Sequence, residues 1–267
     1  MRIEREYDLH RIYQQLTEQG ELRSPRGMPT LEIENFTYTV APRVRFNRFV
    51  PRKLNLDYIK REFQWYIGAD VKDLSIVEYA KIWGPMVKGG QLNSNYGHYW
   101  FKRDSGVRSV LRTLRQDPDS RRAVIPMLGT ESAHFERDIA DMPCTTSVEF
   151  RIRDGKLKAH FIMRSQDAVY GMGNDLPTFS MLQEVVATLL EVPMGDLSVT
   201  AGSFHVYERH FDMVNQMSEY ECPMVEATEV PHMTIADACD ILNQIVPKTT
   251  DFGLWLTSLS ALRDPKK

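Results

Sequence analysis

The sequence predicts an α+β fold, because one region reads as a hairpin and another as a buried helix. Apolar residues alternate along 146–152 and again along 156–164, and Asp154 and Gly155 between them form a preferred two-residue hairpin turn. Residues 176–191 instead carry apolar side chains at helical spacing. No Ser/Gly linker, repeat or low-complexity tract separates these regions, so we expect a single domain over the whole chain, 1–267.

The other elements follow from the same two periodicities and from the turn residues between them. Tyr7, Ile12, Tyr13 and Leu16 lie at helical spacing, and Gly20 follows as a stop signal. In chain order, we expect a helix within 4–19, a loop over 23–30, strands over 31–40 and 43–49, helices over 56–67 and 75–83, a polar loop over 89–98, a helix over 107–116, a turn over 117–122, a strand over 123–127 and, after the hairpin and the apolar helix, a strand over 197–206 and a helix from Glu208.

The composition favours a soluble cytosolic protein with neither nucleic acid nor a membrane as a bulk partner. A net charge of −3 provides no bulk attraction to nucleic acid or to an anionic membrane. The first residues lack an apolar signal region, and no run approaches the ~20 apolar residues that span a bilayer. Cys144, Cys222 and Cys239 lie far apart without metal-ligand spacing, which favours free thiols in a reducing compartment. We therefore expect a cytoplasmic protein with no metal, nucleic-acid or membrane partner.

Cys144 is the first candidate for chemistry. It follows Met142 and Pro143 and opens the predicted hairpin, so it lies where a loop becomes a strand. A thiolate in such a place can act as a nucleophile, but a lone cysteine is more often a buried apolar residue. Its position alone leaves both interpretations open.

Three arginines are the second candidate. Arg121 and Arg122 follow a turn, and Arg164 ends a strand with apolar alternation. The planar guanidinium group donates two hydrogen bonds at once and therefore suits a phosphate group. The simpler interpretation of any one of them is a solvated surface residue.

Residues 170–175, Tyr-Gly-Met-Gly-Asn-Asp, are the third candidate, because two glycines and two short polar side chains precede a buried helix. Asn174 or Asp175 at this point has a simple structural interpretation as the N-cap of the helix. On the local pattern alone, that interpretation is favoured.

The chain resembles the thymidylate synthase superfamily in seven short motifs, which occur in the order and spacing of that family over roughly residues 26–215. They are Arg61-Glu-Phe-Gln-Trp65, Ile82-Trp83, Asn95-Tyr-Gly97, Asp119-Ser-Arg-Arg122, Met142-Pro-Cys-Thr145, Met163-Arg-Ser-Gln-Asp-Ala-Val-Tyr-Gly-Met-Gly-Asn-Asp175 and Gly202-Ser-Phe-His-Val-Tyr-Glu-Arg-His210. Each motif is weak alone, but the ordered set is specific. The resemblance implies a thymidylate synthase-like fold, in which a large mixed β-sheet is flanked by helices and dimerises through one face of the sheet.

The resemblance also implies a reaction between a pyrimidine nucleoside monophosphate and 5,10-methylenetetrahydrofolate as co-substrate. Cys144 would attack C6 of the base as a thiolate, with its pKa lowered by Arg164. Glu62 would move protons through ordered water, and Tyr96 would help to remove the proton from C5. The implied binding residues are Arg164, Ser165, Arg26 (favoured over Arg23) and, from a second subunit of the homodimer, Arg121 and Arg122 for the phosphate; Asn174 for the nucleotide; His205 and Tyr207 for the sugar 3′ hydroxyl; and Trp83 and Asp167 for the pterin of the folate.

Three departures from the synthase pattern favour the hydroxymethylase branch of the superfamily, which acts on cytidylates. Thr145 stands where synthases usually have His, and Ser203 stands where they have Asp. Asp175 stands where synthases have the Asn that reads uracil. The loop from Asn93 to Gly97 also resembles the hydroxymethylase branch.

The chemistry of Asp175 supports the same choice. An Asn amide complements the N3–H donor and the O4 acceptor of uracil. A carboxyl group accepts from the 4-amino group of cytosine and from N3–H once attack at C6 has led to protonation of N3. Asp175 would then stabilise charge that develops along the reaction path. With uracil, a carboxylate oxygen would face O4, an unpaired contact that costs about 1–3 kcal/mol.

The expected activity is therefore 5-hydroxymethylation of a cytidylate, with dCMP favoured over CMP. A thymidylate synthase or another nucleotide C5 methylase ending in hydride transfer is the alternative within the superfamily. The sequence ends at 262–267 without the apolar tail of synthases, which fits access of water to the site. An idle homologue that binds nucleotide or RNA is disfavoured by the retained Cys144 and Glu62. Phage and bacterial origins both remain open, and a phage enzyme would work in the host cytoplasm.

Overall fold

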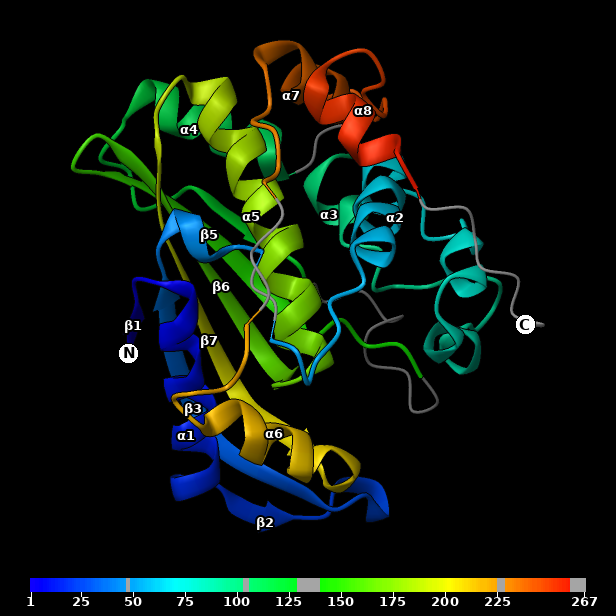
Figure 1. The fold of residues 1–267 in the computed structure, drawn as a ribbon. Helices are drawn as coiled ribbons and strands as arrows, with labels where there is room; N and C mark the ends of the chain where they lie inside the picture. Colours follow the sequence, from blue (N-terminus) through cyan, green and yellow to red (C-terminus); the bar gives the residue numbers. More distant parts are fainter. Residues whose placement is uncertain (47–48, 103–105, 129–139, 225–228, 260–267) are drawn as a thin grey trace.

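Seven strands form one mixed sheet, with the order β1-β3-β7-β6-β5-β4 and with β2 paired to β3 at one end. The computed structural model describes residues 1–46, 49–102, 106–128, 140–224 and 229–259 (Figure 1). The strands are β1 Arg2–Ile3, β2 Glu21–Arg23, β3 Thr30–Val40, β4 Val124–Pro126, β5 Thr145–Arg153, β6 Lys156–Asp167 and β7 Met194–Tyr207. The helices are α1 His10–Gln19, α2 Leu56–Gly68, α3 Gly97–Trp100, α4 Gly106–Gln116, α5 Tyr170–Leu190, α6 Phe211–Ser218, α7 Ile235–Leu242 and α8 Asp251–Thr257. The predicted α+β class, with a large mixed sheet flanked by helices, is confirmed.

The predicted hairpin is β5 and β6, and its turn has the backbone that the residue types require. Asp154 (φ 54°) and Gly155 (φ 67°) both adopt positive φ, as a tight hairpin turn needs. β6 and β7 are parallel, whereas β3 pairs with β7 and β5 pairs with β6 in antiparallel fashion. β6 and β7 follow each other in the chain, and α5 between them provides the long crossover connection that a parallel pair needs.

Helix α5 lies along one face of the sheet and forms the centre of the core (Figure 1). Most of its side chains are buried, which explains why its apolar residues occur on nearly all sides. The ring of Phe161 on β6 stacks on Phe179 of α5, with centroids 3.9 Å apart. This contact places the alternating apolar positions of the hairpin against the helix.

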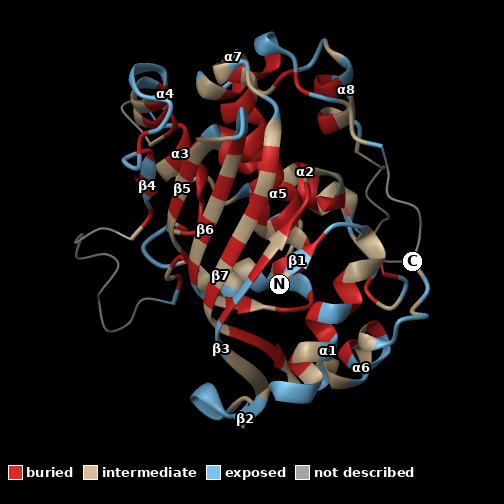
Figure 2. Cartoon of the chain, turned by 90° about the vertical axis from the view of Figure 1, so that its left-hand side faces the viewer, coloured by how far each residue is buried: buried red, intermediate tan, exposed pale blue. Residues whose placement is uncertain are grey.

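The opposite face of the sheet is polar along its centre. Thr37 bonds to Thr200 across β3 and β7 (2.9 Å), and the His160 ring nitrogen lies 2.9 Å from the same Thr200 hydroxyl. Figure 2 turns this face toward the viewer, and buried and intermediate residues alternate along β6 and β7. Dimerisation through this face stays a prediction.

Two predicted elements are wrong. Where a strand was expected over 43–49, the described residues form a 3-10 turn, Pro42–Val44, because Pro42 has no N–H to continue the ladder and the chain leaves the sheet. Residues 47–48 of that span lie outside the described residues. Arg45 then forms a buried ion pair with Glu184 of α5. The helix expected over 75–83 consists of two 3-10 helices, Ser75–Glu78 and Lys81–Met86, because Ala80 between them is extended.

Helix α5 begins six residues before its predicted start, at Tyr170 rather than at 176. The carboxylate of Asp167 accepts hydrogen bonds from the backbone N–H groups of Val169 (2.6 Å) and Tyr170 (2.8 Å) and so stabilises the N-terminus. Asn174 and Asp175 therefore lie inside the helix, and the N-cap interpretation of either residue is wrong.

The sequence analysis also missed five short elements, β1, β2, α3, α7 and α8. Two of them carry local signals, since Thr234 forms a capping box with Asp237 before α7 and Thr250 caps α8. No helix in the described part of the chain is long and apolar enough to cross a membrane.

Arg52 is a buried cation that stabilises the start of α5 through hydrogen bonds to two backbone carbonyls. Pro177 has no N–H to give to the carbonyl of Gly173, and Arg52 Nη2 donates to that carbonyl instead (3.3 Å). Arg52 Nη1 donates to the carbonyl of Val169 (3.2 Å). Gly173 is required here because a Cβ at this position would lie 1.5 Å from Arg52 Nη1.

Replacing Gly173 with Ala is therefore expected to lower the free energy of unfolding by about 1–3 kcal/mol, the usual cost of overpacking a core. Gly68→Ala is the matched control, because Gly68 is exposed at the end of α2 and an added Cβ there meets nothing within 4 Å. Urea denaturation of both variants measures the difference. Equal stabilities would show that Arg52 does not occupy this position.

Candidate active site

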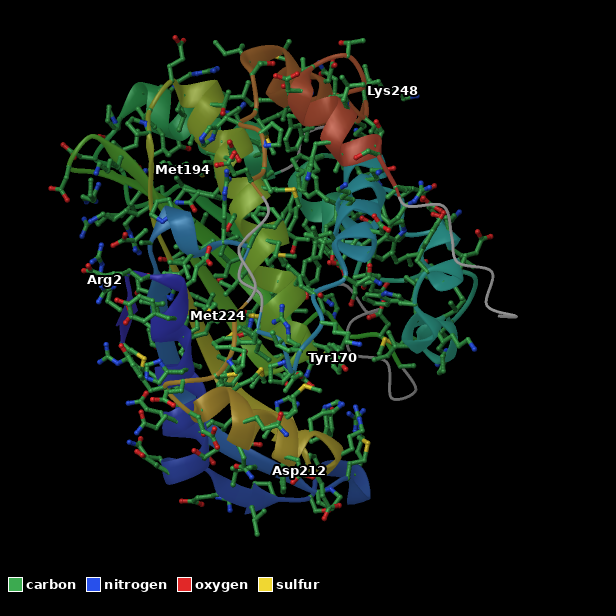
Figure 3. The ribbon with its side chains drawn as sticks, in the orientation of Figure 1. Arg2, Tyr170, Met194, Asp212, Met224 and Lys248 are labelled. Carbon is green, nitrogen blue, oxygen red and sulfur yellow. The ribbon has the colours of Figure 1, made fainter. Side chains whose placement is uncertain are left out.

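The candidate residues gather where β6 and β7 end and where β5 and α5 begin. β6 and β7 are parallel neighbours, and their register places Ser165 opposite Ser203 and Asp167 opposite His205. Tyr170, labelled in Figure 3, marks the N-terminal end of α5 beside these strand ends. The polar side chains of both strands and of the first turns of α5 therefore share one end of the core.

Cys144 and Arg164 form a direct pair. Arg164 Nη2 lies 3.7 Å from Cys144 Sγ, within hydrogen-bond distance for sulfur. The same guanidinium group donates to the backbone carbonyls of Met142 (2.8 Å) and Pro143 (3.1 Å) and so fixes the approach to the hairpin. The predicted neighbourhood of thiol and cation is present.

The pKa of the Cys144 thiol is raised, whereas the sequence analysis expected Arg164 to lower it. Burial raises the pKa of Cys144, Arg164 lowers it in part, and Asp175 and Asp141 raise it further. A single chain therefore holds the thiol mostly protonated at neutral pH. Arg164 therefore offsets only part of the effect of burial on this pKa.

Glu62 is a buried carboxyl group on α2 that is only partly ionised at neutral pH. It is 5% exposed, and burial raises its pKa to about 7, although hydrogen bonds from Tyr58 and Tyr66 act in the lowering direction. The Tyr58 hydroxyl donates to Glu62 Oε1 (2.7 Å) and accepts from Nε1 of Trp83 (3.0 Å). A group with this pKa can both give and take a proton at physiological pH.

Asp175 is a second carboxyl group whose pKa is raised. Burial raises the pKa of Asp175 to about 8, the charges of Glu62 and Asp167 act in the same direction, and Gln166 lowers it. Gln166 Nε2 donates to Asp175 Oδ2 (2.9 Å), and the Tyr38 hydroxyl donates to Gln166 Oε1 (3.0 Å). Asp175 is therefore a neutral acid in about the same pH range as Glu62.

Tyr96 lies beside the nucleophile. Its hydroxyl accepts a hydrogen bond from the backbone N–H of Thr145 (3.3 Å), and its ring stacks on Tyr66 at 5.4 Å. Burial raises the pKa of Tyr96 well above its usual value. Tyr96 therefore stays protonated at neutral pH, so its predicted help in proton removal at C5 requires a partner that accepts the proton.

The residues predicted to hold the sugar are close to one another on β7. His205 is 8% exposed, its Nδ1 lies 3.4 Å from the hydroxyl of Ser203, and its ring meets Tyr207 edge to face at 5.1 Å. Asn174 is partly buried one residue before Asp175 on α5. Their predicted contacts with a nucleotide stay predictions.

The remaining phosphate candidates do not meet Arg164 within one chain. Arg121 and Arg122 are exposed, just before β4. Because Val124 lies opposite Glu149, five residues beyond Cys144, these arginines are on the order of 20 Å from the thiol. A role for them at the phosphate therefore requires another subunit, as the resemblance implies.

The loop with the fifth phosphate candidate lies next to the sugar residues. Arg26 is exposed with φ 56°, in a 3-10 turn, Pro25–Gly27, whereas Arg23 forms an ion pair with Glu21. Thr30 after this loop is the register partner of Tyr207. Arg26 is thus the less constrained of the two arginines.

The two predicted folate contacts have structural roles as well. One carboxylate oxygen of Asp167 caps α5, and the indole N–H of Trp83 is used by Tyr58. In the described residues no group of three or more His, Cys, Asp or Glu side chains could hold a metal ion. The segment 262–267, whose lack of an apolar tail entered the prediction, lies outside the described residues.

Four residues of this region were missed by sequence reasoning: Tyr38, Arg52, Tyr58 and Gln166. Tyr38 reads as a core residue of a strand, and its hydroxyl partner is 128 positions away. Tyr58 carried a usable signal, because it lies four residues before Glu62 and therefore on the same side of α2. Gln166 lies inside the motif Met163–Asp175, but the motif does not reveal its contact with the Asp175 side chain.

Comparison of the sequence with known proteins finds similarity to one family and to several phage proteins. The sequence profile of the thymidylate synthase family matches residues 7–253. The deoxycytidylate 5-hydroxymethyltransferases of Enterobacteria phages T4 and T2 are each 33% identical to the chain over 204 residues. These matches cover 71% of the chain and 80% of each phage protein.

Proposed function

Because the chain belongs to the thymidylate synthase family of one-carbon transferases, we propose that it hydroxymethylates C5 of a cytidylate, with 5,10-methylenetetrahydrofolate as co-substrate. The family membership accounts for a pyrimidine nucleotide and a folate as substrates. Beyond the family, we propose that the base is cytosine, that the substrate is dCMP and that the group transferred is hydroxymethyl. The relatives named as deoxycytidylate 5-hydroxymethyltransferases support it.

The observation that carries the proposal is the carboxyl group of Asp175 in the site of Cys144, which accepts a hydrogen bond from Gln166 and whose pKa is raised by burial to about 8. A neutral carboxylic acid has one donor and one acceptor, which complement N3 and the 4-amino group of cytosine. With its pKa raised to about 8, Asp175 can give its proton to N3 as Cys144 attacks C6. The charge that would build up on the ring is thereby neutralised where it forms.

Formation of the Cys144 thiolate depends, in this proposal, on positive charge from the second subunit. Arg164 offsets only part of the burial that raises the thiol pKa. In the proposed homodimer, Arg121 and Arg122 of the other subunit join Arg164 and Ser165 at the phosphate and add positive charge near the thiol. Arg26, next to the sugar site, completes the phosphate contacts.

The proposed reaction forms and breaks bonds in a balanced sequence. Cys144 Sγ bonds to C6, and the electron pair of the C5–C6 double bond moves to C5. C5 then bonds to the methylene carbon of the folate, whose bond to N10 has broken with protonation of N10, so that this carbon is held by N5 alone. The C5 proton leaves, through Tyr96 and a water molecule, and the C–N bond to tetrahydrofolate breaks with protonation of that nitrogen. Water then adds to the exocyclic methylene group, and the Cys144–C6 bond breaks to give the 5-hydroxymethyl nucleotide.

Glu62 is the residue proposed to guide the added water. Its pKa of about 7 allows it to accept the proton that water loses and to return it later. Trp83 and Asp167 would hold the pterin nearby, and Tyr58 joins Trp83 to Glu62 by hydrogen bonds. The alternative outcome is reduction of the methylene group by hydride from the folate, as in a synthase.

The proposed preference for a deoxyribose nucleotide is supported by the names of the relatives and not by a contact in the structure. His205 and Tyr207 suit the 3′ hydroxyl, and Asn174 adds a polar side chain at the nucleotide. dCMP is favoured because the curated relatives are named for deoxycytidylate. The enzyme would work in the cytoplasm, and in the host cytoplasm if a phage encodes it.

Release of tritium from C5 tests the proposal. The enzyme is incubated with methylenetetrahydrofolate and, separately, with dCMP, CMP or dUMP labelled at C5. We expect release from dCMP at a rate at least about tenfold above that from dUMP, because uracil O4 would face an acceptor oxygen of Asp175. Faster release from dUMP would overturn the cytosine assignment, and retention of label in all three would indicate a homologue without this activity.

A further inference from the structure

The amide of Gln166 is held between two groups that determine its orientation. Gln166 is 2% exposed, on β6, and bridges Tyr38 of β3 and Asp175 of α5. Tyr38 is fully buried, and in the described residues its hydroxyl has only the Gln166 oxygen as a hydrogen-bond partner. A buried hydroxyl that loses its acceptor is costly, so Tyr38 favours the orientation in which the amide oxygen faces it.

This orientation points the Gln166 NH2 group at Asp175 Oδ2. The carbonyl oxygen of a carboxylic acid is a better acceptor than its hydroxyl oxygen, so the hydrogen bond from Gln166 favours the carbonyl oxygen at Oδ2. When Asp175 is neutral, its proton therefore lies on Oδ1. The carboxyl group is thus not symmetric, because Oδ2 is an acceptor and Oδ1 is a donor.

We propose that Tyr38 and Gln166 are positioning residues that fix the acid proton on Asp175 Oδ1 and thereby select cytosine over uracil. Oδ1–H donates to N3 of cytosine, and Oδ2 accepts from the 4-amino group. In the same pose, uracil would bring O4 against the acceptor Oδ2 and N3–H against a donor, so both contacts would be repulsive. This inference rests on the proposed function and names the source of its base specificity.

Among the groups around Asp175, Gln166 is the one that donates a side-chain hydrogen bond to its carboxyl group in the described residues. The titratable groups that act on it come from α2, β3, β6 and the loops around Cys144, and most of them are neutral hydroxyl, thiol or acid groups. They are Tyr58, Glu62, Tyr66, Tyr38, Asp167, Tyr96 and Cys144. In the described part of the site, Gln166 donates the side-chain hydrogen bond that the Asp175 carboxyl accepts.

The test measures binding of dCMP and dUMP to the wild type, Gln166→Leu and Tyr38→Phe by titration calorimetry, without folate. Gln166→Leu is expected to reduce the ratio of the dUMP to the dCMP dissociation constant about tenfold, the value of one hydrogen bond. Tyr38→Phe is expected to reduce it by a smaller factor, because the amide can still adopt the original orientation. Gln183→Leu is the matched control, since Gln183 is 1% exposed between the sheet and α5 but bonds only to the backbone carbonyls of Leu157, Gly195 and Asp196.

The pH dependence of dCMP binding gives a readout that a loss of packing would not change. Gln166 lowers the pKa of Asp175, so Gln166→Leu is expected to move the alkaline loss of dCMP affinity to higher pH. Gln183→Leu should leave that midpoint in place even if it lowers stability.

The outcomes separate the two proposals. If the wild type binds dCMP tightly and both variants keep its discrimination and its midpoint, the positioning role is overturned and the proposed function stands. If the wild type itself prefers dUMP, the proposed function falls and this inference falls with it. Should Gln166→Leu not fold, unchanged discrimination in Tyr38→Phe overturns the inference, and reduced discrimination supports it.

Discussion

Cys144→Ser is expected to lower the turnover number roughly a thousandfold or more while the nucleotide still binds. The substitution keeps the size of the side chain but replaces the thiol with a hydroxyl group of far higher pKa. Burial already raises the pKa of the thiol, so an alkoxide at the same place is not accessible at neutral pH. Steady-state kinetics and nucleotide titration together measure the loss of chemistry and the retained binding.

Cys239→Ser is the control, because Cys239 is an exposed free cysteine outside every motif of the site. Its activity should equal that of the wild type. Turnover by Cys144→Ser within about tenfold of the wild type would contradict covalent catalysis through this residue.

Asp175→Asn is expected to reduce turnover of dCMP about a hundredfold or more and to lower the preference for dCMP over dUMP. An amide can donate a hydrogen bond to N3, but it cannot transfer a proton to it during attack at C6. How much the turnover of dUMP increases depends on the orientation of the amide group introduced at position 175. Gln166 holds the acceptor atom of residue 175 toward itself, so a double variant with Gln166→Leu should use dUMP better than Asp175→Asn alone.

A measurement of stability tests the protonation of Asp175 without any activity. The native state keeps a proton up to about pH 8 that the unfolded chain loses near pH 4. The stabilisation from this raised pKa is complete below about pH 4 and is lost as the pH rises to about 8. Asp175→Asn has no such proton, so its free energy of unfolding should rise relative to the wild type between these pH values. Asp212→Asn, on the surface of α6, should show a constant difference.

The sequence predicted the elements whose signals are local and strong. The hairpin was visible in its alternation and its Asp154-Gly155 turn, and the buried helix in its apolar residues. The strand expected over 43–49 failed because Pro42 ends the ladder, which alternation alone does not express. The start of α5 was misplaced because two glycines argued for a loop, whereas Arg52 and Asp167 satisfy the backbone there.

Some features of the site could likewise be predicted from the sequence and others could not. The pairing of Cys144 with Arg164 follows from strand register, so it could be expected from two motifs on one hairpin. The raised pKa values of Glu62 and Asp175 could not, because they arise from burial by segments far apart in the chain. For the same reason the contacts of Tyr38 and Gln166 emerge only once β3, β6 and α5 are assembled.

The mass of the nucleotide product tests the central claim most directly. The enzyme and methylenetetrahydrofolate are incubated separately with dCMP, CMP and dUMP, and each product is weighed by mass spectrometry. We predict that dCMP gains one CH2O and that tetrahydrofolate is formed. A gain of CH2 with formation of dihydrofolate would mean that hydride transfer completes the reaction, and it would contradict hydroxymethyl transfer.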